Sequence, residues 1–305
     1  MQKTSIERVR SFNRLVSQRI GALNDSYLGR GRPLGQARLV FETGPDGCDV
    51  QGLRDRLGLD SGYMSRLLRT LAEDGLVSVD EDPSDRRRRI LRLTEKGSAE
   101  RAAYDRLSDD FACSILEPLR EAHRERLVSA MAEVERLMNA AAVTIGIEPA
   151  DSEAARACVD AYFAELDLRF EGGFDPGSGG YSSAEKTGAE CFLLARLHGR
   201  AVGCGALKAL DDATGEIKRM WIAPDMRGIG LSRRLLDALE AQALELGMTR
   251  VRLDTNRALA EAQALYRKAG YEPIPRYNDN SYADLWFEKT LDTGDQPGKS
   301  SPISR

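Results

Sequence analysis

The chain has 305 residues, of which 42% are apolar and 30% charged, and its formal net charge is −4. This length suits two domains of about 150 residues each, and the composition is that of an ordinary folded protein. No apolar run reaches the roughly 18–20 residues that a membrane helix needs, so we expect no membrane span. The five cysteines lack any CxxC spacing, so we expect no metal site and a reducing, cytoplasmic location.

The first half, residues 1–142, predicts a mostly helical domain. Apolar residues recur at helical spacing over residues 5–23, and shorter helical patterns follow at 35–44, 49–60 and 61–75. The pattern then changes to two short strands around the turn DPSD at residues 82–85. Residues 95–141 return to long helix, which is interrupted near Pro118.

One of these helices has the residue types of a DNA-recognition helix. Ser61 is predicted as its N-cap, and an apolar stripe at helical spacing predicts its buried face: Met64, Leu67, Leu68 and Leu71. The opposite face offers hydroxyl and guanidinium donors, which reading of the major groove requires. The candidate DNA contacts on this face are Ser61, Gly62, Tyr63, Ser65, Arg66 and Arg69.

Four consecutive arginines, Arg86 to Arg89, follow the predicted turn. Residues 1–142 hold 24 basic against 23 acidic residues, a net charge of only +1, so DNA binding has to rest on local clustering. The helix, turn, helix and hairpin occur in an order that resembles the MarR family of regulators, and DPSDRRRRILRLTEKG is similar to that family's wing. The resemblance implies a winged helix-turn-helix with Arg86, Arg87 and Arg88 as groove contacts. We expect Asp85 to orient a neighbouring arginine.

The MarR resemblance also implies a homodimer that binds a palindromic operator in double-stranded DNA. Dimer symmetry is then mirrored in the two half-sites of the operator. In this chain the dimer-forming helices would be residues 5–24 and 98–141.

After residue 142 the pattern mixes strands and helices. Strands are predicted at 143–149, 191–197, 201–210, 215–222, 251–255 and 282–291, and helices at 151–166, 232–246 and 258–270. We expect a second domain at residues 143–291. The last residues, 292–305, are rich in Pro, Gly and Ser and predict a disordered tail.

A glycine-containing loop in this half indicates an anion site. A predicted strand ends at Ile222, the loop holds Gly228 and Gly230, and a helix begins near Leu231. Amides at a helix N-terminus bind anions, and glycines let the chain approach phosphates closely. The loop matches neither the P-loop nor the dinucleotide pattern.

The loop and its surroundings resemble the GNAT family of N-acetyltransferases. That family's pattern [QR]-x-x-G-x-[GA] falls on Arg227, Gly230 and Ser232, and Ser232 departs from the usual Gly or Ala. The resemblance covers nearly all of residues 143–291 and implies an α+β fold with a mixed central sheet. It also implies acetyl-CoA as cofactor, with its pyrophosphate on the loop amides and its pantetheine arm along the preceding strand. The cofactor-binding candidates are Trp221, Ile222, Ala223, Arg227, Gly228, Ile229, Gly230, Leu231, Ser232 and Asn256.

Candidate catalytic residues follow from the same resemblance. Tyr266 matches the family's tyrosine acid, which returns a proton to the thiolate of coenzyme A; the alternative is a tyrosine used only for packing. Glu216 is a candidate base at the start of the strand before the loop, and the alternative is a strand-end surface residue. Asp254 is a second candidate base.

The variable loops should bind the amine that accepts the acetyl group. Residues 161–183 and 275–284 are the predicted acceptor loops. The candidates are Tyr162, Glu165, Arg169 and Phe174. Acidic side chains suit a cationic amine and Arg169 suits a carboxylate, which together describe an amino-acid-like molecule.

Three functions remain open from the sequence. The chain is predicted to be a bifunctional bacterial regulator and acetyltransferase that acts on a small-molecule or protein amine. One alternative is a regulator whose GNAT domain only senses acetyl-CoA or another ligand. The other is an acetyltransferase whose winged helix serves only dimerisation.

Overall fold

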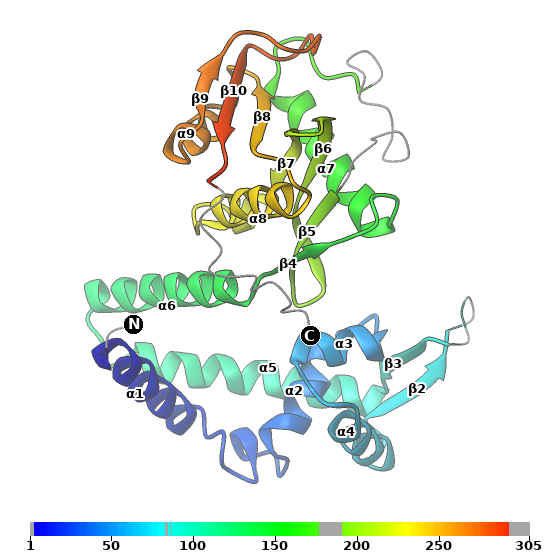
Figure 1. The fold of residues 1–305 in the computed structure, drawn as a ribbon. Helices are drawn as coiled ribbons and strands as arrows, with labels where there is room; N and C mark the ends of the chain where they lie inside the picture. The colour runs from blue at the N-terminus through cyan, green and yellow to red at the C-terminus, as the bar shows by residue number, and fades with distance from the viewer. Residues whose placement is uncertain (1–2, 83–84, 86, 177–190, 293–305) are drawn as a thin grey trace, which may run out of the picture. The chain divides into compact units, whose positions relative to one another are not determined.

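The computed structural model describes residues 3–82, 85, 87–176 and 191–292. The predicted tail, apart from its first residue, and the predicted groove contact Arg86 therefore lie outside the described residues. The chain divides into two compact units, residues 1–131 and 132–305, which are described separately (Figure 1). Helix α6 (Glu121–Ala142) runs across this division and ends at the residue where the sequence predicts the domain boundary.

The first unit is mostly helical, as predicted. Its elements are α1 (Lys3–Arg19), a 3-10 turn (Tyr27–Gly29), α2 (Leu34–Thr43), β1 (Cys48–Asp49), α3 (Val50–Leu57), α4 (Ser61–Glu73), β2 (Val77–Glu81), β3 (Arg89–Leu93), α5 (Glu95–Leu116) and the start of α6. The strands form a small sheet in the order β1-β3-β2. Apolar side chains of α2, α3, α4 and β3 form the core beneath it, including Leu39, Leu53, Leu71 and Leu91.

The hairpin β2–β3 projects beyond the helices of this unit (Figure 1). Its strands pair antiparallel from Val77 opposite Leu93 to Glu81 opposite Arg89. The end of the hairpin is fixed to α5 by Thr94, whose side chain accepts a hydrogen bond from the Gly97 amide and caps that helix. A Cβ at Gly97 would lie 1.9 Å from the Leu76 carbonyl oxygen, so only glycine permits this approach of helix and hairpin.

Helix α1 is shorter than predicted. The helical pattern over residues 5–23 continues to Leu23, but the helix ends at Arg19 and turns follow it. Gly21 there has φ 65°, a left-handed conformation that stops a helix. All of α1 is described and none of its side chains is buried; Ile6, Val9, Phe12 and Leu15 are exposed.

The described residues of the second unit form a seven-stranded mixed sheet in the order β4-β5-β6-β7-β8-β10-β9. Its elements after α6 are β4 (Thr144–Ile147), α7 (Glu153–Arg169), β5 (Cys191–Leu197), β6 (Arg200–Asp211), β7 (Thr214–Ile222), a 3-10 turn (Pro224–Met226), α8 (Leu231–Glu245), β8 (Arg250–Thr255), α9 (Ala260–Lys268), β9 (Glu272–Ile274) and β10 (Leu285–Thr290). The pair β7–β8 is parallel and the other neighbours are antiparallel, which confirms the predicted α+β fold with a mixed sheet.

Helices cover both faces of this sheet. Successive side chains of β5 point to opposite faces. Phe192 and Leu194 pack against Cys158 and the rest of α7, whereas Leu193 belongs to the core that includes Leu235 of α8. The described part of the sheet is therefore covered by helices on both faces. A small molecule can reach the middle of such a sheet where two neighbouring strands separate.

Candidate functional site

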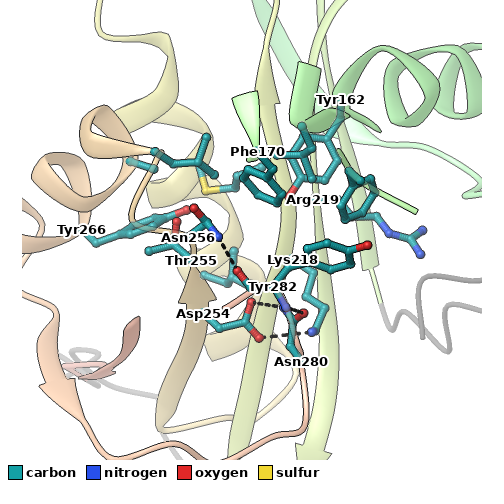
Figure 2. A pocket seen from close by; sticks show the side chains of 16 residues that line it. Tyr162, Phe170, Lys218, Arg219, Asp254, Thr255, Asn256, Tyr266, Asn280 and Tyr282 are labelled. Carbon is teal, nitrogen blue, oxygen red and sulfur yellow. Dashed lines mark hydrogen bonds and ion pairs between the residues drawn. The ribbon is translucent and has the colours of Figure 1, made fainter. Parts of the chain in front are cut away.

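Strands β7 and β8 separate partway along their length. They pair from Thr214 opposite Arg250 to Glu216 opposite Arg252 and not beyond. A hollow of about 600 Å³ lies past this point, lined from β7 by Lys218 and Met220 among others, and from β8 by Asp254. Figure 2 shows side chains of both strands and of α7 and α9 around this hollow. We call it the acceptor hollow.

A bulge in β7 shapes one wall of the acceptor hollow. The register between β6 and β7 shifts, so that Gly205 lies opposite both Arg219 and Met220. Arg219 has φ 54°, a left-handed conformation that is uncommon for a residue with a side chain. A bulge interrupts the strand ladder and bends the strand, and here it brings Met220 to the boundary of the hollow.

Two carboxylates share one lysine at the base of the hollow. The Nζ of Lys218 lies 3.3 Å from Glu216 Oε1 and 3.6 Å from Asp254 Oδ2. Asn278 bridges the same two carboxylates, donating from Nδ2 at 3.0 Å to Glu216 and 2.5 Å to Asp254. Figure 2 shows Lys218 and Asp254 facing one another.

The predicted base Glu216 does not line the hollow. Its side chain is only 3% exposed, and the Tyr277 hydroxyl also donates to it at 2.9 Å. Burial, then the charges of Glu216 and Asp254, raise the pKa of Tyr277, so this phenol stays a donor. Asp254, the second candidate, lines the hollow and is held there by Asn280 at 3.0 Å. Of the two candidate bases, Asp254 is therefore the one that lines the hollow.

Tyr266 of α9 lies where the acceptor hollow meets a larger one. It lines both hollows, yet it is only 7% exposed and packs against Tyr271 and Phe287, with ring centroids 5.8 and 6.1 Å away. Burial and, after it, the charge of Asp254 raise the pKa of Tyr266 well above its ordinary value. The phenol is therefore protonated at neutral pH and has a proton to donate.

The larger hollow, of about 1030 Å³, is the candidate cofactor hollow. Five of the predicted cofactor-binding residues line it: Trp221, Ile222, Arg227, Gly228 and Ser232. Gly228 and Gly230 have φ 75° and 78°, and Gly230 immediately precedes α8, so the glycines place the loop across the N-terminus of that helix.

The other predicted cofactor contacts have different positions. Ala223 and Leu231 are buried in the core, and Ile229 packs against that core. The Ala223 amide donates to the Val202 carbonyl at 2.9 Å, so it is not available to a pantetheine arm. Asn256 lines the acceptor hollow instead of the cofactor hollow, where its side chain donates to the Tyr282 carbonyl at 2.7 Å.

Two predicted substrate residues, Glu165 and Arg169, line the cofactor hollow and not the acceptor hollow. Glu165 of α7 accepts from Trp221 Nε1 at 2.9 Å and contacts the Arg227 guanidinium, and Arg169 is 3.2 Å from the same carboxylate. Burial alone would raise the pKa of Glu165, but the hydrogen bonds from Arg227 and Trp221 outweigh it and lower that pKa. Arg169 and Glu165 neutralise each other, so they do not support the predicted amino-acid-like acceptor.

The other two predicted substrate residues, Tyr162 and Phe174, do line the acceptor hollow. They belong to an aromatic wall that also includes Phe170 and Tyr282. The Phe174 and Tyr282 ring centroids are 4.8 Å apart, and those of Phe170 and Tyr282 are 5.8 Å apart. The acceptor hollow therefore has an aromatic side and a charged base.

Sequence reasoning missed Lys218, Phe170 and Met220 and named only the loop that holds Asn280 and Tyr282. The signal for Lys218 was its spacing of two from Glu216, which places both on one face of β7. The separation of β7 from β8, which turns that face into a hollow, has no local signature in the sequence.

In the first unit, α4 has the predicted exposed face. Met64, Leu67, Leu68 and Leu71 are buried, and the predicted contacts Ser61, Gly62, Tyr63, Ser65, Arg66 and Arg69 are exposed. The predicted N-cap is wrong by one residue. Asp60 caps the helix by accepting from the Tyr63 amide at 2.8 Å, and Ser61 is the first helical residue.

Two described residues near the hairpin tip, Asp85 and Arg88, have partners in the protein. Asp85, which we expect to orient a neighbouring arginine, accepts a hydrogen bond from the Arg87 backbone amide at 3.0 Å. Arg88 lies 3.8 Å from Asp49, the N-cap of α3. Arg87 and Arg88 line a groove of about 890 Å³ together with Ser61 and Ser65 of α4. The hairpin and α4 thus present basic and hydroxyl groups to one open surface.

Comparisons with known proteins match both units. A model of the acetyltransferase (GNAT) family matches residues 159–271, and a MarR family model matches residues 30–88. An IAA acetyltransferase of Azospirillum brasilense is 44% identical over 105 residues, which are 33% of this chain and 67% of that protein. The uncharacterized N-acetyltransferase YjgM of Escherichia coli is 34% identical over 86 residues, 27% of this chain and 52% of that protein.

Solved structures also match parts of the chain. A putative acyl-CoA N-acyltransferase of Klebsiella pneumoniae is 28% identical, with a TM-score of 0.40, and the match covers 49% of this chain and 98% of that one. A probable transcriptional regulator of Pseudomonas aeruginosa is 24% identical, with a TM-score of 0.36, and the match covers 41% of this chain and 96% of that one.

Proposed function

This chain belongs to the GNAT family of N-acetyltransferases and carries a MarR-family domain ahead of it, and on that premise we propose that it combines two activities. It binds a palindromic operator in double-stranded DNA, and it transfers the acetyl group of acetyl-CoA to an amine. The observation that carries the second activity is the meeting of the cofactor and acceptor hollows at Tyr266. Aromatic side chains and the charged base line the acceptor hollow on several sides, and a recess lined in this way suits a small-molecule amine better than a folded protein.

The cofactor hollow has features that fit acetyl-CoA. Gly228 and Gly230, both with positive φ, let the loop backbone approach a pyrophosphate at the start of α8. Ser232 lines the hollow, so the departure from the family pattern places a hydroxyl where the phosphates would bind. The pantetheine arm would follow the end of β7 at Trp221 and Ile222 towards Tyr266.

In the proposed reaction Asp254 accepts a proton and Tyr266 donates one. Asp254, directly or through a water, takes a proton from the acceptor ammonium, which leaves a neutral nitrogen with a free electron pair. That nitrogen attacks the thioester carbonyl, a carbon–nitrogen bond forms, and the carbon–sulfur bond breaks. Tyr266 donates its proton to the departing thiolate of coenzyme A. The nitrogen of the new amide then gives up its extra proton, which restores the Tyr266 phenol. Lys218 stays between the carboxylates and limits their mutual repulsion.

The DNA-binding proposal is supported by the exposed face of α4 and the groove beside it. In that role Arg66 and Arg69 contact the major groove, and Arg87 and Arg88 of the hairpin reach a neighbouring groove or its phosphates. Exposed apolar residues of α1 and α6 support a homodimer through residues 5–24 and 98–141. They include Phe12, Leu15, Val128 and Met131.

Two assays test the two activities separately. Binding of labelled DNA from upstream of the gene should weaken steeply with salt, and Arg87→Ala should weaken it without changing acetyl transfer. A protein that acetylates amines but shows no salt-sensitive DNA binding uses its winged helix only for dimerisation. A protein that binds the DNA but releases no coenzyme A thiol with any amine in a broad panel is a sensor instead of an enzyme.

A further inference from the structure

An arginine from α6 lies beside the loop of the cofactor hollow. A Cβ at Gly228 would come within 3.3 Å of a terminal guanidinium nitrogen of Arg136. Gly228 lines the cofactor hollow, whereas α6 precedes the segment that the GNAT family model matches. The guanidinium of Arg136 therefore reaches the margin of the cofactor site from an element outside that segment.

The loop's own arginines are engaged by protein groups. Arg227 donates from Nε to the Ile222 carbonyl at 2.9 Å and contacts Glu165. Arg233, in the first turn of α8, pairs with Asp237 at 2.7 Å. Arg227 is the more firmly held of the two, because it binds a main-chain carbonyl as well as Glu165, whereas the Arg233–Asp237 pair is exposed.

Arg234 fixes the end of α6 to α8. Its guanidinium donates to the Ala140 carbonyl at 2.5 Å and to the Val143 carbonyl at 2.7 Å. Arg136 lies about one helical turn before Ala140. Its backbone is therefore held next to the loop, and only its side chain has to move to meet a ligand.

The partner of Arg136 is one that a phosphate can replace. Arg136 donates from Nε at 2.9 Å and from Nη2 at 2.5 Å to Glu133 Oε2, one turn earlier on α6, and the two side chains are 43% and 49% exposed. An exposed pair of this kind is weak because water screens it. A guanidinium binds a phosphate with two parallel hydrogen bonds, which are stronger.

We propose that Arg136 is a phosphate-binding residue of the acetyl-CoA site, supplied by α6. The inference rests on the proposed function, since it adds a contact to that cofactor site. On binding, Arg136 exchanges Glu133 for a phosphate of coenzyme A at the edge of the loop. The site would thereby include the helix that joins the two units.

The test is acetyl-transfer kinetics of the full chain with Arg136→Ala. We expect the KM for acetyl-CoA to rise about tenfold, with kcat within about twofold of the wild type, because a charge-assisted bond to the phosphate is lost and the reacting groups are untouched. Arg136→Lys should lose less. Arg156→Ala removes an exposed arginine of α7 that lines neither hollow and should leave both constants unchanged.

A truncated donor separates phosphate binding from a structural effect. S-acetylpantetheine has no phosphate, so wild type and Arg136→Ala should use it with equal kcat/KM. An active wild type with an unchanged KM in Arg136→Ala would overturn this inference alone, and so would an equal loss with both donors. A wild type that neither binds nor uses acetyl-CoA would overturn the proposed function and this inference together.

Discussion

Replacing Tyr266 by Phe tests the proposed acid directly. The phenol lines both hollows, is 7% exposed, and has a raised pKa because it is buried and lies near Asp254. General acid catalysis contributes about 10²–10⁴-fold to rate. A thiol has an ordinary pKa of only about 8.5, so its thiolate leaves readily and the effect should fall at the low end of that range. We therefore expect kcat to fall about 100-fold.

The KM for acetyl-CoA should change little, because Phe keeps the ring that packs against Tyr271 and Phe287. The assay is release of coenzyme A thiol at saturating amine, followed from pH 6 to 9. Tyr271→Phe is the matched control: Tyr271 neighbours Tyr266 at 5.8 Å but lines neither hollow, so kcat should not change. A fall of less than threefold in Tyr266→Phe, or an equal fall in the control, would refute the role of Tyr266 as acid.

Three further predictions concern the base, the hairpin and pH. Asp254→Asn should lower kcat/KM for the amine about 100-fold at pH 7 and less at high pH, where more amine is neutral; a larger loss in Glu216→Gln would reverse the assignment of the base. Gly97→Ala should destabilise the first unit by about 2 kcal/mol in thermal unfolding, since the new methyl meets the Leu76 carbonyl; Gly52→Ala, which meets only the Asp49 side chain, is the control and should stay near wild type. The pKa of Glu100 is lowered, first by the hydrogen bond from Arg30, so the stability it provides is present above its ordinary value of 4.5 and is lost as pH falls through the lowered pKa. Glu100→Gln should therefore lower Tm at pH 7 by about 2–4 °C, and the difference from the wild type should shrink as the pH is lowered below the ordinary value of 4.5; a difference that stays the same throughout acid titration would exclude the ionised pair as the cause.

Much of the fold follows from local sequence patterns. The stripe Met64 to Leu71 is buried because its spacing matches one face of a helix, whatever surrounds it. The position of the cofactor loop follows from a strand that ends at Ile222 and a helix that begins at Leu231. The hairpin followed by α5 was predicted from the pattern and from the resemblance of residues 82–97 to the MarR wing, and the structure adds the reason for Gly97: a Cβ there would meet the Leu76 carbonyl.

The site was less predictable, because it depends on contacts between distant segments. Glu216 is suitable by residue type, but Tyr277 and Asn278, some 60 positions later, surround its carboxylate. Glu165 and Arg169 have the charges expected of an acceptor site, yet both line the cofactor hollow, where Glu165 pairs with Arg227, some 60 positions later in the chain. In the sequence Arg136 is an ordinary arginine on the surface of a helix, and only the fold places it beside the loop before α8. In each case the partner is absent from the local sequence.

The most direct test of two separate sites on one chain is hydrogen–deuterium exchange of the full protein with each ligand. Acetyl-CoA should slow the exchange of amide hydrogens at residues 221–232, and it should make no direct contact with residues 61–69. Operator DNA should slow exchange at residues 61–69. Protection of residues 221–232 by acetyl-CoA together with protection of 61–69 by DNA is the result that the account predicts. Absence of either protection at saturating ligand would contradict it.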